Sequence, residues 1–89
     1  MITNGYVRES IGDIIKDWDC IGIRQFSPDE YLDATAHLCD ELALNDSHKN
    51  VIRKVKRVFK EEFIDSFEAS DDEISAIATK ICEVLIEFR

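Results

Sequence analysis

Residues 48–63 read HKNVIRKVKRVFKEEF, and this stretch decides the fold. Its apolar residues recur every three or four positions, which is the period of one helix face. They are Val51, Ile52, Val55, Val58, Phe59 and Phe63. The other positions from 48 to 60 are polar or basic. Because a single apolar stripe must be buried against other elements, the stretch predicts a helix packed in a bundle.

A first helix is predicted upstream, from about Asn4-Gly5 to near Asp19. Its apolar positions follow the same period and are Val7, Ile11, Ile14, Ile15 and Trp18. Residues 20–27 are then expected to form a loop whose isoleucines, Ile21 and Ile23, enter the core. Trp18 is expected to close one end of the bundle and Asp19 to turn the chain after the helix. Tyr31 is expected to pack against Trp18.

The second helix has the clearest start in the chain, at Ser27-Pro28-Asp29-Glu30. Serine is a good N-cap, proline fits the first helical position, and glutamate three residues after the cap completes a capping box. We expect this helix to run to about residue 43. Its expected buried face consists of Tyr31, Leu32, Thr35, Leu38, Cys39 and Leu42.

A fourth helix is predicted after Ser70-Asp71-Asp72-Glu73, which again places glutamate three residues after a serine cap. Its expected buried face is Ile74, Ile77, Ala78, Ile81, Cys82, Leu85 and Phe88. Residues 64–69 either extend the third helix or form a loop. The fold class that follows is all-α, a small antiparallel bundle of about four helices, with residues 1–89 as a single helical domain.

The charges of the chain are sorted into three blocks. Residues 1–47 carry a net charge of −7, residues 48–60 a net of +6 without any acid, and residues 61–89 a net of −7. The total of −8 predicts repulsion from nucleic acid and from anionic membranes, and fast, salt-sensitive capture of a basic partner. The candidate binding carboxylates are Asp29, Asp33, Asp40, Glu41, Asp71, Asp72 and Glu73.

The basic residues of the third helix allow three interpretations. They can pair within the molecule, with Arg57 reaching Glu61 one turn later and others reaching the acidic helices alongside. They can instead bind nucleic acid or an acidic patch on a partner protein. The surface for both of these alternatives is Lys49, Arg53, Lys56, Arg57 and Lys60.

The sequence contains no arrangement typical of an enzyme. His37 and His48 are its only histidines, and neither a nucleophile elbow nor a glycine-rich phosphate loop is present. The acids after residue 65 lack the spacing and the glycine of a calcium loop. The three cysteines, Cys20, Cys39 and Cys82, are widely separated and predict reduced thiols rather than a zinc site. We therefore expect no enzyme activity, no cofactor and no metal.

The location expected from the sequence is the cytoplasm. The first residues show no signal-peptide pattern, and no apolar stretch approaches the length of about 20 residues that spans a bilayer. The chain is expected to be a monomer on its own and to have no contact with a membrane.

Asp46-Ser47 resembles the Asp-Ser pair to which acyl carrier proteins attach phosphopantetheine. The helix that follows is basic here rather than acidic, and no leucine follows the serine. We therefore interpret Ser47 as the N-cap of the third helix.

The run Asp17-Trp18-Asp19-Cys20-Ile21-Gly22, followed by Asp29-Glu30-Tyr31, resembles a pattern of small bacterial helical proteins, the YugE-like family. Members read W-D-P-I-G and then D-E-Y, so Cys20 stands where the family has proline. The resemblance implies a helical protein of this length and helix order, of a kind carried beside polymorphic or contact-dependent toxins.

The function expected from this resemblance and from the acidic surface is that of an immunity protein. It would bind a cognate toxin domain, most readily a basic nuclease domain, and occlude it without chemistry. The seven candidate carboxylates would form the binding surface. The alternative is a small regulatory protein that contacts nucleic acid or an acidic partner through the basic residues 48–60.

Overall fold

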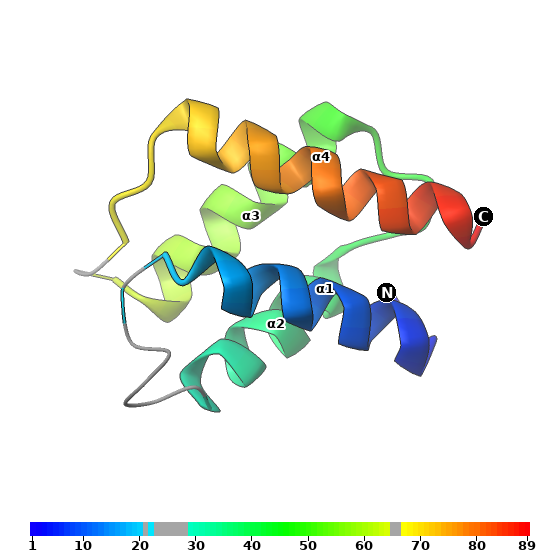
Figure 1. The fold of residues 1–89 in the computed structure, drawn as a ribbon, viewed down its shortest axis with the longest axis horizontal. Helices are drawn as coiled ribbons and strands as arrows, with labels where there is room; N and C mark the ends of the chain where they lie inside the picture. Colours follow the sequence, from blue (N-terminus) through cyan, green and yellow to red (C-terminus); the bar gives the residue numbers. More distant parts are fainter. Residues whose placement is uncertain (21, 23–28, 65–66) are drawn as a thin grey trace.

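The computed structural model describes residues 1–20, 22, 29–64 and 67–89 and contains four helices in this part of the chain (Figure 1). They are α1 (Gly5–Trp18), α2 (Asp29–Glu41), α3 (His48–Glu62) and α4 (Asp71–Glu87). This confirms the predicted all-α bundle. The predicted capping box at Ser27-Pro28 and the placement of Ile21 and Ile23 lie outside the described residues.

The helix ends are set by polar side chains that satisfy free backbone groups. Asn4 caps α1 by accepting hydrogen bonds from the backbone N–H groups of Tyr6 and Val7. Ser47 caps α3 and Ser70 caps α4, each accepting from the N–H three residues later at 3.2 and 3.1 Å. The N-cap interpretation of Ser47 is thus confirmed.

The ends of α1 and α3 settle two further predictions. Asp19 follows α1 with a φ of 47°, a left-handed conformation that reverses the chain. The predicted turn at Asp19 is therefore confirmed. Helix α3 ends at Glu62, with Phe63 as its C-cap, so residues 64 and 67–69 lie outside any helix, and residues 65–66 are outside the described part of the chain.

Each helix packs on the next, and α4 returns to α1, so the four form a closed ring of antiparallel neighbours. The contacts between helix ends show the directions. Arg8 near the start of α1 reaches Asp40 near the end of α2. At the opposite end of the bundle, Trp18 closes α1 and donates its indole N–H to Glu73 in the first turn of α4.

All four helices contribute to one apolar core. It contains every apolar residue predicted for α3, although Ile52 is only half-buried. One prediction for α2 is wrong: Leu32 is 51% exposed, and Ala34 is fully buried in its place. Tyr31, Thr35 and Leu38 fill the side of α2 that faces the core. Leu32 lies beyond the edge of this buried face, so the face is turned relative to the predicted one.

An aromatic cluster closes the end of the core where α1 and α3 finish. The Trp18 ring lies 5.4 Å from the Phe59 ring and 5.9 Å from that of Phe67, measured between centroids. The Tyr31 ring stands edge-on to Phe63 at 5.9 Å. The prediction that Trp18 closes the bundle end is consistent with these contacts, which stabilise the end beyond simple area burial.

The cysteines are free thiols in the structure. Burial raises the pKa of the Cys39 thiol, which lies in the core, and raises that of Cys20 to about 12. Such thiols pack as small apolar groups. Among the described residues, no helix is long and apolar enough to cross a membrane.

Candidate functional site

The antiparallel ring gathers acidic residues at one end of the molecule. Helices α1 and α3 end there, and α2 and α4 begin there, on the left of Figure 1. The hydroxyl of Tyr31 in α2 donates to Asp19 after α1 at 2.6 Å, and Trp18 reaches Glu73 at 3.3 Å. The carboxylates of this acidic end are Asp29, Glu30, Asp33, Glu61, Glu62, Asp71, Asp72 and Glu73. Three groups of acids, of which the first and the last are about 40 residues apart in the sequence, therefore share one end.

Three of the predicted binding residues at the acidic end have no ion-pair partner among the described residues. Asp29, Asp33 and Asp72 are exposed, and none makes an ion pair within the described part of the chain. Asp71 is different, because Lys56 of α3 binds it at 2.7 Å. The hydrogen bond and the charge of Lys56 hold the pKa of Asp71 below its ordinary value.

A hollow of about 250 Å³ lies within the acidic end. Its lining consists of Glu30, Asp33, Glu62 and Phe63. The hollow combines three carboxylates with one aromatic side chain, and the carboxylates suit a cationic side chain.

Two of the predicted binding residues lie at the other end of α2. Asp40 and Glu41 are in its last turn, and Glu41 shares His37 with Glu61 and Glu62 of the acidic end. Arg8 binds Asp40 at 2.8 Å, and Arg57 binds Glu41 at 3.0 Å. Since both carboxylates hold two helices together, they are less available to a partner than Asp29 and Asp33.

His37 lies among carboxylates from two helices. Its Nδ1 is 2.9 Å from Glu62, and its Nε2 is 3.7 Å from Glu61 and 3.8 Å from Glu41. The sequence places His37 within the second predicted helix, but it does not reveal these neighbours, because two of the three come from α3. The spacing of His37 and Glu41 by one turn is the only signal of the cluster that sequence alone contains.

The basic residues of α3 divide into paired and unpaired ones. Lys54, Lys56 and Arg57 each bind a carboxylate of another segment. Lys49, Arg53 and Lys60 are exposed and make no ion pair with any described residue. Intramolecular pairing among the described residues therefore accounts for only three of the six basic residues of α3. Arg57 reaches Glu41 of α2 rather than the predicted Glu61.

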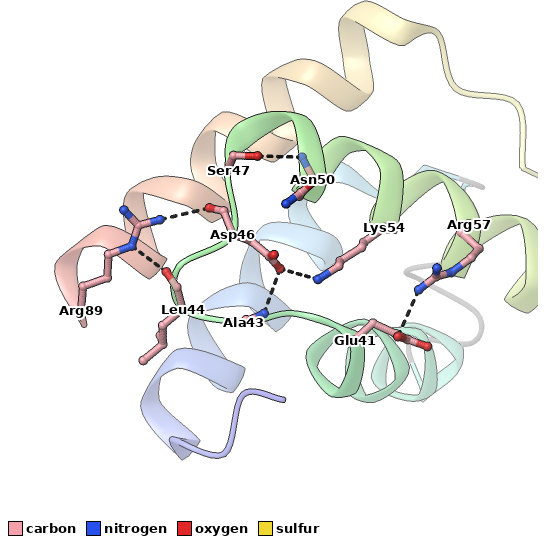
Figure 2. A network of polar contacts seen from close by, with 9 residues as sticks. All are labelled: Glu41, Ala43, Leu44, Asp46, Ser47, Asn50, Lys54, Arg57 and Arg89. Carbon is pink, nitrogen blue, oxygen red and sulfur yellow. Dashed lines mark hydrogen bonds and ion pairs between the residues drawn. The ribbon is translucent and has the colours of Figure 1, made fainter.

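Asp46 organises the connection between α2 and α3, and Figure 2 shows this corner in detail. The side chain is 7% exposed and accepts hydrogen bonds from the backbone N–H of Ala43 at 2.9 Å and from Lys54 at 2.7 Å. Arg89 donates to the carbonyl oxygens of Leu44 and Asp46 at 2.6 and 3.0 Å. We call Ala43, Leu44, Asp46, Lys54 and Arg89 the Asp46 corner.

The ionised form of Asp46 is favoured in spite of its position. Burial disfavours the charge, but the hydrogen bonds from Lys54 and Ala43 outweigh burial and lower the pKa of the carboxyl. The sequence places Asp46 between two predicted helices, directly before the N-cap Ser47. A buried aspartate between two helices leaves no periodic hydrophobic pattern in the sequence, so the sequence does not predict the Asp46 corner.

Within the described part of the chain, no three His, Cys, Asp or Glu side chains are arranged to hold a metal ion. Comparisons of the chain with protein-family models, with curated proteins and with solved structures found no match. The resemblance to the YugE-like family therefore stays a prediction.

Proposed function

We propose that this chain is an immunity protein that binds a cognate basic toxin domain through the acidic end and occludes it without chemistry of its own. The observation that supports this most directly is a set of exposed carboxylates, Asp29, Asp33 and Asp72, which have no ion-pair partner among the described residues and are presented by two helices at one end of the bundle. The toxin class comes from the family resemblance and the nuclease target from the charge.

The physical basis of the proposed binding is charge complementarity. Carboxylates held on helices pair with arginine and lysine, and their summed field accelerates association with a basic surface. The hollow beside Phe63 provides room for one cationic side chain of the partner. A nuclease presents such side chains where it holds phosphates, so carboxylates of the acidic end would compete for the same positions.

A second candidate function is a regulatory protein that binds nucleic acid through α3. The observation in its favour is that Lys49, Arg53 and Lys60 have no partner in the described part of the chain. A mobility-shift titration over salt distinguishes the two candidates. Binding through α3 requires a steep salt dependence that weakens in Arg53→Ala with Arg57→Ala.

The test of the leading proposal uses the tagged protein as bait in a lysate of its native source, followed by mass spectrometry. We expect recovery of one basic protein that is lethal when expressed alone and harmless when coexpressed with this chain. Asp33→Lys with Asp72→Lys should abolish both the recovery and the protection.

The matched control is Glu83→Lys with Glu87→Lys, which changes the same charge on exposed positions of α4 beyond its first turns. This control should leave recovery and protection intact. A partner that is retained by Asp33→Lys with Asp72→Lys would exclude the acidic end as the binding surface. Recovery of nucleic acid in place of a protein would support the second candidate.

A further inference from the structure

We propose that a groove along α3 binds an acidic, amphipathic segment of a partner protein. Two hollows that share Lys56 form this basic groove. The first has a volume of about 280 Å³ and is lined by Lys49, Asn50, Ile52, Arg53 and Lys56. The second has a volume of about 150 Å³ and lies beside the start of α4, with Lys60, Phe67 and Ile74 in its lining.

The charge of the basic groove is arranged along one face of the helix. Residues 49, 53, 56 and 60 follow one another at intervals of four, three and four positions, which places them on a common stripe. Lys56 binds Asp71, whereas Lys49, Arg53 and Lys60 have no carboxylate partner among the described residues. In a protein with a net charge of −8, the acids of the described residues thus leave these three cations unpaired although acids are abundant.

Each hollow of the groove has apolar side chains in its lining. Ile52 is half-buried in the first hollow, and the half-buried Phe67 lines the second. A volume of 150–280 Å³ has room for an aliphatic side chain in each hollow. A segment with carboxylates beside such side chains would satisfy both the cations and the apolar side chains of the lining.

Nucleic acid fits the same surface less well. Phosphates need cations but no apolar side chains, and the negative charge of the rest of the molecule opposes a polyanion at long range. Glu68 also lines the second hollow. We therefore assign the carboxylates of the partner to Lys49 and Arg53 at the first hollow, and its apolar side chains to the apolar residues that line both hollows.

The test uses a labelled synthetic helical peptide of about 15 residues, with glutamates on one face and leucines on the adjoining face. Fluorescence anisotropy with the full chain measures its binding. Two matched peptides replace all glutamates with glutamine or all leucines with alanine. We expect saturable binding of the first peptide and at least about tenfold weaker binding of each matched peptide.

Variants of the protein locate the site. Lys49→Glu with Arg53→Glu should abolish peptide binding, because two cations of the groove become carboxylates that repel the acidic peptide. Both positions are exposed, so their replacement does not disturb the core. Lys16→Glu with Lys80→Glu changes the same charge outside the groove and should leave the affinity unchanged. Circular dichroism of both variants confirms that the helices are retained.

Three results would overturn the proposal. The first is absence of saturable binding of the acidic leucine peptide, or binding that Lys49→Glu with Arg53→Glu does not weaken. The second is displacement of the peptide by a DNA duplex at lower concentration than by unlabelled peptide, which would assign the groove to nucleic acid. The third is a dimer of the native chain, detected by sedimentation, that dissociates in the variant Lys49→Glu with Arg53→Glu. This result would assign the groove to a second copy of the chain.

Discussion

The Asp46 corner and the acidic end use the same chemical group in opposite ways. In the corner, one carboxylate is almost fully buried and receives hydrogen bonds from Ala43 and Lys54. At the acidic end, Asp29, Asp33 and Asp72 are exposed and have no partner in the described part of the chain. Charge at the corner serves the fold, and charge at the acidic end is available for another molecule.

This difference separates stability from binding. Removal of one partner from a buried ion pair leaves an uncompensated charge in a poorly solvated site, which is costly. Exposed carboxylates are hydrated in both the folded and the unfolded state, so their replacement changes stability little. Substitutions at the two regions should therefore affect different measurements.

The largest effect is expected for Lys54→Met, which keeps the volume of the side chain but removes its charge. Asp46 would stay buried without its cation, because both side chains of the pair are largely covered. We expect the free energy of unfolding to fall by about 3–5 kcal/mol. Urea denaturation measures this, with the exposed Lys80→Met as the control that should change little. An equal effect of the two substitutions would mean that the corner is no more important than the surface.

The pH dependence of stability should identify Asp46 as well. Because the pKa of this carboxyl is lower in the folded state than in the unfolded one, its contribution is present above the unfolded pKa of about 3.9. The contribution is lost as the pH falls through the folded pKa. The difference in stability between the native chain and Asp46→Asn should therefore shrink from pH 7 to acid conditions. A difference that stays constant over this range would contradict the assigned role of the charge.

A smaller effect is expected for Arg89→Ala. The substitution removes two hydrogen bonds to the carbonyl oxygens of Leu44 and Asp46. Since the side chain is partly exposed and water can replace it, we expect a loss of about 1 kcal/mol. Arg89→Lys should restore only part of this, because a single ammonium does not reproduce the forked geometry. Thermal unfolding measures both variants.

The smallest effect on stability is expected at the acidic end. Asp33→Asn with Asp72→Asn should change the free energy of unfolding by less than about 0.5 kcal/mol. Any increase in the free energy of unfolding that comes from reduced repulsion between carboxylates should disappear when salt is added. Urea denaturation at low and high salt measures this. A loss comparable with that of Lys54→Met would show that these carboxylates are structural, and would remove the contrast between the two regions.

Periodicity and capping predict the helices but not their polar contacts. The stripe Val51 to Phe63 and the caps Ser47 and Ser70 are local signals, and the structure confirms them. Leu32 is misassigned, because residues at the edge of a stripe fit either face until the neighbouring helix is placed. Pairs such as Arg8 with Asp40 join residues far apart in sequence, and charge blocks alone do not identify which acid a given base reaches.

The candidate surface was predicted in part. The sequence indicates which residues are acidic, and the helix order determines at which end of the molecule they lie. Asp29, Asp33 and Asp72 share one end because antiparallel packing places the starts of α2 and α4 there, although these two helices do not contact each other. Asp40 and Glu41 instead bind Arg8 and Arg57. That division depends on tertiary geometry, which no single stretch of the sequence encodes.

The ring of antiparallel helices has a consequence for folding kinetics. Three of its four helix interfaces join neighbours in the chain, and only the interface of α1 with α4 closes a long loop. Folds dominated by such local contacts cross their barrier in about microseconds to milliseconds. Closure by Trp18 on Glu73 and by Tyr6 on Phe88 is then the step with the largest entropic cost, so substitutions at this seam should slow refolding most.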